Sequence, residues 1–207
     1  MAASFAAMLN RKPDLNTVTQ TLDDRDPADL RREIERLDRA HLLQLWQLAE
    51  AAEPVEFDHF VPPEAADRPV VHAGRNSIPI FPAYRRFEKH FARMSPDSPT
   101  LVGFNEGAAR SLIGPGYFVF RRSESDVERQ RGAAYVDYLS LPESTVPAGW
   151  PPIVPNEKGF QKFVYSGTQD FMRRVSSHVS IGMPFKGQRQ LPFPFVLVRQ
   201  NSTSTAP

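Results

Sequence analysis

The 207-residue sequence contains no cysteine, which excludes disulfide bonds, thiolate nucleophiles and cysteine-bound zinc. It also lacks an excess of charge, because 25 lysines and arginines stand against 24 aspartates and glutamates, a net charge of +1 at pH 7. Binding to a phosphate backbone depends on a local excess of cations, so we expect no nucleic-acid partner. No apolar run approaches the roughly 18 residues of a membrane-spanning helix, and no signal peptide is evident. We therefore expect a soluble protein located in the cytoplasm.

Motifs of common catalytic and metal sites are missing too. The sequence has no G-x-S-x-G nucleophile motif, no H-x-x-x-H or H-E-x-x-H pair and no glycine-rich loop that opens a helix. The histidines are scattered along the chain, at His41, His59, His72, His90 and His178. We therefore predict no catalytic residue, no metal site and no cofactor, although histidines on separate strands could still converge in the fold.

The sequence does contain 20 prolines, concentrated in residues 54–82 and 142–155. Proline interrupts helices and cannot donate to a strand ladder, so both segments are predicted to be extended connections. The second segment includes Trp150 and is too apolar for a flexible linker. We expect it to wrap across the surface of a sheet.

Three helices are predicted, with residues 1–25 expected to be flexible. Asp26 and Pro27 are a favourable helix start, and an apolar stripe opposite many charges continues to residue 52. Residues 83–94 place aromatic side chains on one side and cations on the others. Residues 157–175 carry phenylalanines and valines at helical spacing.

Strands are predicted where apolar residues alternate or form short runs between turn residues. These segments cover residues 100–104, 117–121, 133–141, 179–183 and 193–199. The predicted fold class is α+β, with a mostly antiparallel sheet curled into a small β-barrel, because closure removes exposed edges. We expect one domain over residues 26–200, helical in 26–95 and a barrel in 100–200, followed by a disordered tail at 201–207.

A pattern in the C-terminal half resembles a known family. It consists of Asp170-x-Met172-Arg173-x-Val175-x6-Gly182, a preceding Val136-Asp137-Tyr138 and a final FPFVLVR segment. Residues 114–200 are thereby similar to a small bacterial family that carries the GXWXG domain and a companion domain of unknown function. The resemblance implies a lipocalin-like barrel that binds lipids. The G-x-W-x-G motif itself is absent, since Trp150 is followed by Pro151.

The leading functional hypothesis is non-enzymatic binding of a lipid or another apolar small molecule in the barrel. The predicted ligand-binding residues are Tyr117, Phe118, Phe120, Tyr135, Asp137, Arg173, His178 and Phe195. Asp137 and Arg173 would be costly to bury alone, so they either form a structural ion pair or meet a ligand.

Two alternatives remain open. The first is an enzyme that uses Asp137, Asp170 or His178 as acid or base in the same cavity. The second is a module that binds a protein partner or a membrane through its amphipathic helices. In that case the predicted helix 83–94 would present a set of cations to an anionic membrane surface, namely Arg85, Arg86, Lys89 and Arg93.

Overall fold

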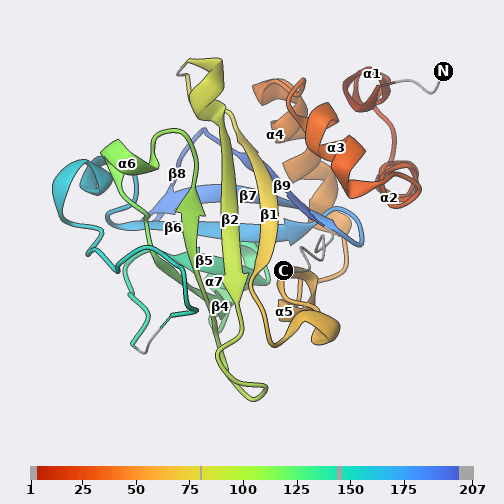
Figure 1. The fold of residues 1–207 in the computed structure, drawn as a ribbon. Helices are drawn as coiled ribbons and strands as arrows, with labels where there is room; N and C mark the ends of the chain where they lie inside the picture. Colours follow the sequence, from red (N-terminus) through yellow and green to blue (C-terminus); the bar gives the residue numbers. More distant parts are fainter. Residues whose placement is uncertain (1–3, 80, 144–145, 201–207) are drawn as a thin grey trace.

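A computed structural model describes residues 4–79, 81–143 and 146–200, and a closed antiparallel barrel is its main feature (Figure 1). Within these residues, eight strands form the barrel in the order β1-β2-β3-β4-β5-β6-β7-β9, and β9 closes the circle by pairing with β1. The strands are β1 Val70–Asn76, β2 Arg86–Ala92, β3 Leu101–Glu106, β4 Phe118–Arg122, β5 Ala134–Asp137, β6 Thr168–Arg174, β7 Val179–Lys186 and β9 Phe195–Arg199. A short β8, Arg189–Gln190, continues β7 around its turn. The predicted α+β class with a small antiparallel barrel is confirmed.

Alternate residues of each strand face the inside of the barrel, as the pleat of a strand requires. On β7, Val179, Ile181 and Met183 belong to an apolar cluster shared with the N-terminal helices. Gly182 instead lies under the ring of Phe195 in the interior. The alternation in residues 179–183 therefore separates an outer, helix-covered face from an inner face.

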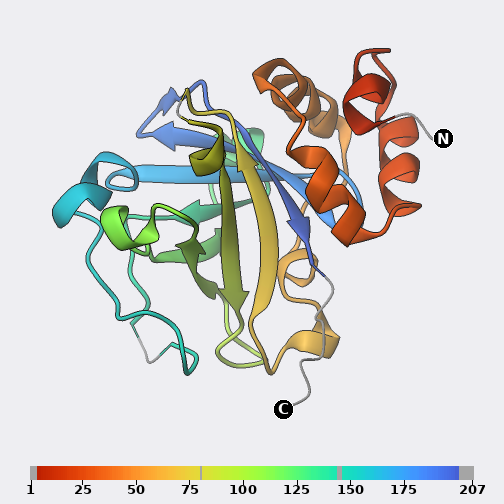
Figure 2. The ribbon, with the colours of Figure 1, turned by 45° about the horizontal axis from the view of Figure 1, so that its top comes forward.

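The N-terminal helices cover one side of the barrel, over β7 and β9 (Figures 1 and 2). They are α1 Phe5–Leu9, α2 Leu15–Asp23, α3 Pro27–Ile34, α4 Arg39–Leu48 and the 3-10 turn η1 Ala49–Ala51. The predicted helix start at Asp26 is confirmed, since its side chain accepts a hydrogen bond from the amide of Ala28. The predicted single helix 27–52 is wrong in its continuity, because Asp38 forms a capping box that starts α4.

Residues 1–25, expected to be flexible, include α1 and α2 in the described part of the chain. Phe5, Leu9, Val18 and Leu22 are fully buried in the apolar cluster over the barrel. Their helices are short, and only contact with the barrel and with α3 and α4 stabilises them. The predicted tail 201–207 lies outside the described residues.

The predicted helix 83–94 is wrong: the chain forms η3 Pro82–Arg85 and then strand β2. Tyr84, Phe87 and Phe91 fit a helical spacing, but Phe87 and Phe91 also fit a strand in which Lys89 lies between them. β2 is flanked by β1 and β3, and the hydrogen bonds to both neighbours decide in favour of the strand.

The predicted helix 157–175 is also wrong. It corresponds to the short 3-10 turn η4 Gly159–Phe163 followed by strand β6. Phe160 and Phe163, two members of the expected apolar stripe, are exposed. β6 completes the barrel by pairing with β5 on one side and β7 on the other, so tertiary pairing overrides the local helical spacing.

In the described part of the proline-rich segment, residues 146–155 pack across the outside of the barrel, as predicted. The ring of Trp150 packs on Phe104 and Tyr117, with ring centroids 4.9 and 6.3 Å apart. Asn156 then fixes the end of the segment, because its amide donates to the carbonyls of Tyr117 and Tyr138 at 2.8 Å.

The remaining described helical elements are short and lie in loops. They are α5 Phe57–Phe60, η2 Pro63–Ala65, α6 Arg110–Ile113 and α7 Asp126–Arg131. Among the described residues, no helix has the length and apolar character that crossing a membrane requires.

Candidate functional site: the open end of the barrel

One end of the barrel interior is closed by α5. Phe60 on this helix packs against Phe91 and Phe120 inside the barrel, with ring centroids 4.9 and 4.4 Å apart. The imidazole of His72 hydrogen-bonds the carbonyl of Phe60 at 3.0 Å. Burial lowers the pKa of His72 to about 3, so this histidine is neutral and belongs to the core. This half of the interior is filled.

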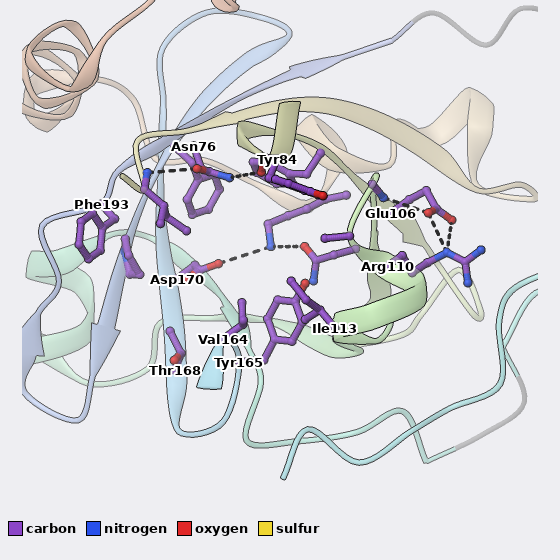
Figure 3. Close-up of a pocket in the computed structure, with 18 of the residues that line it drawn as sticks. Asn76, Tyr84, Glu106, Arg110, Ile113, Val164, Tyr165, Thr168, Asp170 and Phe193 are labelled. Atoms are coloured by element: carbon purple, nitrogen blue, oxygen red, sulfur yellow. Dashed lines mark hydrogen bonds and ion pairs between the residues drawn. The ribbon is translucent and has the colours of Figure 1, made fainter. Parts of the chain in front are cut away.

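The other end holds a cavity of about 450 Å³ (Figure 3). Its walls come mainly from β2, β3, β6, α6 and the loops before and after these elements. Most of the lining side chains are apolar, among them Ile78, Phe87, Ile113, Val164, Phe193 and Phe195. A cavity of this size with mostly apolar walls is within the range of small-molecule sites.

A buried polar group occupies the inner part of this cavity. The ammonium of Lys89 donates to the Asn105 side-chain oxygen at 2.9 Å, contacts the Tyr138 hydroxyl group and lies 3.4 Å from a carboxylate oxygen of Asp170. The side chains of Lys89 and Asp170 are only 2% and 8% exposed. We call Lys89, Asp170, Asn105 and Tyr138 the polar cluster.

The register of the strands brings the polar cluster together. Lys89 on β2 is the direct cross-strand partner of Asn105 on β3, so both side chains lie on the same face. Asp170 comes from β6, which is separated from β2 by three strands in the sheet order. The Lys89–Asp170 ion pair therefore reaches across the barrel interior, and the dashed line in Figure 3 shows it.

Burial disfavours the charged form of each member of this ion pair. Desolvation lowers the pKa of Lys89 to about 8, although Asp170 counteracts the shift. Desolvation likewise raises the pKa of Asp170, and Lys89 counteracts that shift. Burial also raises the pKa of Tyr138 well above its usual value, so its hydroxyl group stays protonated. The cluster thus offers an amine that loses its proton unusually easily, beside a carboxylate able to accept one.

Aromatic rings surround the ammonium of Lys89. The Lys89 nitrogen lies 5.0, 5.2 and 5.8 Å from the ring centres of Phe118, Phe195 and Phe87. Each of these rings is the direct cross-strand partner of a glycine; the pairs are Phe87 with Gly74, Phe118 with Gly103 and Phe195 with Gly182.

The glycines allow the rings to lie flat against the barrel wall. A Cβ atom at Gly182 would lie 2.2 Å from the ring of Phe195, and one at Gly74 would lie 2.6 Å from the ring of Phe87. Any larger residue would push these rings inward. The glycine–phenylalanine pairs therefore keep the space in front of Lys89 open.

Two of the predicted ligand-binding residues lie at this site. Phe195 is part of the cavity wall, and Phe118 lies against Lys89. Phe120 is also inside the barrel, but at the closed end, packed on Phe60. Three of the five predicted aromatic residues, Phe118, Phe120 and Phe195, therefore face the barrel interior, and the position along the strand decides which end each one reaches.

The other predicted residues lie outside the barrel interior. Tyr117 lies beneath the proline-rich segment and donates to the carbonyl of Pro151 at 2.5 Å. Tyr135 belongs to the apolar cluster under the N-terminal helices. His178 follows β6 in the loop to β7, and its ring nitrogen lies 3.8 Å from a carboxylate oxygen of Asp23.

Asp137 and Arg173 do not pair with each other. Asp137 accepts from Arg121 at 3.2 Å. The guanidinium of Arg173 lies 4.0 Å from the centre of the Trp46 ring and donates to the Trp46 carbonyl at 3.0 Å. Successive strand residues point to opposite faces, so these side chains lie on the outer face when Asp170 is inside.

This geometry corrects the proposed acid–base set of Asp137, Asp170 and His178. Asp170 alone lines the cavity among these three residues. Asp170 is thus the candidate that the cavity retains, and Asp137 and His178 do not line it. Within the described residues, no cluster of three or more histidine, aspartate and glutamate side chains forms a site for a metal ion.

The four cations expected on one helical face are also dispersed. Lys89 lies inside the barrel, while Arg86 pairs with Glu35 at 2.7 Å and Arg93 pairs with Asp58 at 2.8 Å. Arg85 belongs to η3. The basic helix that would have contacted a membrane does not exist, because its residues form a turn and a strand.

Lys89, Asn105 and Tyr138 were not among the residues predicted to bind a ligand in the barrel. The period-two pattern of Phe87, Lys89 and Phe91 was an available signal, because a cation between two inward aromatic residues of a strand must be paired. The interpretation of residues 83–94 as a helix hid this period-two pattern.

Comparisons of this chain with models of protein families, with curated proteins and with solved structures found no match. Membership of the GXWXG-associated family stays a prediction.

Proposed function

We propose that this protein binds an apolar small molecule with a neutral polar end in the open end of the barrel. The observation that carries the proposal is the apolar cavity of about 450 Å³ that leads to a buried polar cluster. Binding sites of this kind combine a large apolar surface with a few polar groups that fix the orientation of the ligand.

The charge of the polar cluster favours a neutral ligand end. Lys89 and Asp170 already compensate each other. A carboxylate on the ligand would meet Asp170, and an ammonium would meet Lys89, at side chains that are only 8% and 2% exposed. Either contact is costly at low dielectric constant. A hydroxyl or carbonyl group instead needs only the hydrogen-bonding capacity of Lys89, Asn105 and Tyr138.

Isothermal titration calorimetry with three probes of equal chain length tests this proposal. 1-Decanol is expected to bind, with decanoic acid and decylamine at least about tenfold weaker, since about 1.4 kcal/mol corresponds to a factor of ten. Burial of the chain should appear as a negative heat-capacity change. Equal affinities for all three probes, or no binding of any, contradict the proposal.

A matched pair of variants links the binding to the cavity. Ile113 lines the cavity and its neighbour Leu112 does not; Leu112 is 68% exposed. Ile113→Trp fills part of the cavity and is expected to reduce the affinity for 1-decanol at least tenfold. Leu112→Trp adds the same side chain one position earlier, and its affinity should remain that of the wild type. Equal effects of the two variants would place the ligand elsewhere.

A further inference from the structure

We infer that Lys89 binds apolar aldehydes or ketones covalently, as an imine between its side-chain nitrogen and the carbonyl carbon. This inference rests on the proposed function. It narrows the proposed ligands from apolar molecules with any neutral polar end to apolar aldehydes and ketones. It comes from three features of the site: a lysine at the inner end of a cavity, a proton acceptor beside it, and a cage of aromatic rings around it.

The first feature is the position of Lys89 among the lysines of the chain, which are Lys12, Lys89, Lys158, Lys162 and Lys186. Lys89 alone among these described residues is buried; the other four are exposed. A lysine held in an apolar pocket is a better nucleophile than an exposed one, because desolvation favours the neutral amine. The pKa of Lys89, lowered to about 8, agrees with this position.

The second feature is the carboxylate of Asp170, 3.4 Å from the Lys89 nitrogen. Asp170 can accept a proton from the ammonium and leave the neutral amine. The amine forms a bond to the carbonyl carbon, the electron pair of the C=O bond moves to the oxygen, and one proton passes from the nitrogen to that oxygen. The product is a carbinolamine.

Water then leaves, and the nitrogen lone pair forms the C=N bond. Overall, the ammonium and the carbonyl compound give a protonated imine and one water molecule, so no oxidant or reductant is needed. Asp170 returns its proton to the carbinolamine hydroxyl group, which leaves as that water molecule, and the Asp170 carboxylate remains as the counter-ion of the protonated imine. The Tyr138 hydroxyl group accepts a hydrogen bond from the Lys89 ammonium and lies 3.3 Å from the Asn105 side-chain oxygen. Once Lys89 is neutral, this hydroxyl group can instead donate to the carbonyl oxygen during the attack.

The third feature is the surroundings of the imine. The rings of Phe118 and Phe195 lie 5.0 and 5.2 Å from the Lys89 nitrogen, and the Lys89 side chain is only 2% exposed, which limits the access of water that would hydrolyse an imine. A purely structural ion pair does not need a cavity beside it, and apolar residues usually stabilise a core at least as well. The open space in front of Lys89 therefore favours a chemical role.

Reductive trapping tests the inference with the intact protein. The chain is incubated with decanal and sodium cyanoborohydride at pH 7, digested, and the alkylated lysines are located by mass spectrometry. Lys89 is expected to be labelled at least about tenfold more than any exposed lysine, because the cavity holds the apolar aldehyde beside it and burial lowers the pKa of Lys89 to about 8. Labelling of Lys89 should rise steeply with pH up to about pH 8.

Two variants complete the experiment. Lys89→Met should remove the dominant label, and Ile113→Trp should reduce labelling of Lys89 at least tenfold and leave labelling of the exposed lysines unchanged. Ile113→Trp does not alter the Lys89–Asp170 ion pair, so it tests the inference even where Lys89→Met does not fold. Glyoxylate, a small anionic aldehyde, should show no preference for Lys89.

The possible failures are distinguishable. Labelling of Lys89 that does not exceed that of exposed lysines, in a protein that still binds 1-decanol, overturns the imine and leaves the binding function standing. Absence of both 1-decanol binding and selective labelling overturns both. Preferential labelling that Ile113→Trp does not change also overturns the inference, since the aldehyde would then reach Lys89 by another path.

Discussion

The two ends of the barrel interior use the same strands for different purposes. Phe91 and Lys89 are two residues apart on β2, yet Phe91 packs against Phe60 in a filled core and Lys89 lines a cavity. The difference comes from outside the strands: α5 inserts Phe60 into one end, and the described loops leave the other end open. A barrel of this size is filled by its own side chains unless small residues and loops preserve a space.

The polar groups at the two ends differ in the same way. His72 at the closed end is neutral and hydrogen-bonded to a backbone carbonyl. Lys89 at the open end forms an ion pair with the carboxylate of Asp170 and lies among the rings of three phenylalanines. A core tolerates a neutral polar group with one partner, but an ionic pair costs desolvation energy that packing alone does not justify. The ionic pair is therefore the better indication of function.

The largest expected effect is the loss of stability caused by a substitution at the closed end. Phe60→Ala should lower the free energy of unfolding by about 3–5 kcal/mol, because it leaves a void among buried aromatic rings. Urea denaturation measures the change, and Phe163→Ala, at a position 76% exposed, is the control that should cost under about 0.5 kcal/mol. Where Phe60→Ala remains folded, binding of 1-decanol should be nearly unchanged. A small loss of stability would contradict the conclusion that α5 fills the closed end of the barrel interior.

The second effect tests the ion pair at the open end. Asp170→Leu leaves the ammonium of Lys89 without its buried counter-charge and should lower the free energy of unfolding by about 3 kcal/mol. The double variant Lys89→Met with Asp170→Leu replaces both charges by apolar groups and should recover to within about 1 kcal/mol of the wild type. Denaturation of the three proteins at pH 7 gives these values. Additive losses in the double variant would contradict a coupled pair.

The smallest effect is a difference in pH dependence between the two ends. The pKa of His72 is about 3 in the folded chain and ordinarily 6.5. Between these pH values the imidazole is therefore neutral in the folded chain and binds a proton in the unfolded chain. Lys89 has a pKa of about 8 when folded and 10.5 ordinarily, which gives the same sign in an alkaline window. In both windows the contribution of that group to the free energy of unfolding rises with pH, because the group takes up a proton on unfolding.

Variants separate the two windows. Relative to the wild type, His72→Leu should lose part of the pH dependence between about pH 3 and 6.5, since burial also lowers the pKa values of His59 and His178. The double variant lacking Lys89 and Asp170 should lose the dependence between about pH 8 and 10.5. Urea midpoints across the pH range measure this. An alkaline dependence that the double variant retains would show that Lys89 is not the group responsible.

The strand assignments show what local pattern can predict. The alternation of Val179, Ile181 and Met183 identified β7, and the shared face of Phe195 and Leu197 identified β9. The same local logic failed at residues 83–94 and in residues 168–174, where aromatic residues fit two periods. Hydrogen bonds to both neighbouring strands decided these cases, and such pairing is not visible in a single segment.

The sequence by itself determined the apolar inner faces of several strands, the start of α3 and the proline-rich wrap, because each depends on residues close together in the chain. It also placed Phe118 and Phe195 among the candidate residues. Only the tertiary structure decided which end of the barrel is open and that Lys89 meets Asp170. Closure of the sheet brings β2 opposite β6, and the cost of burying an unpaired charge makes that meeting necessary.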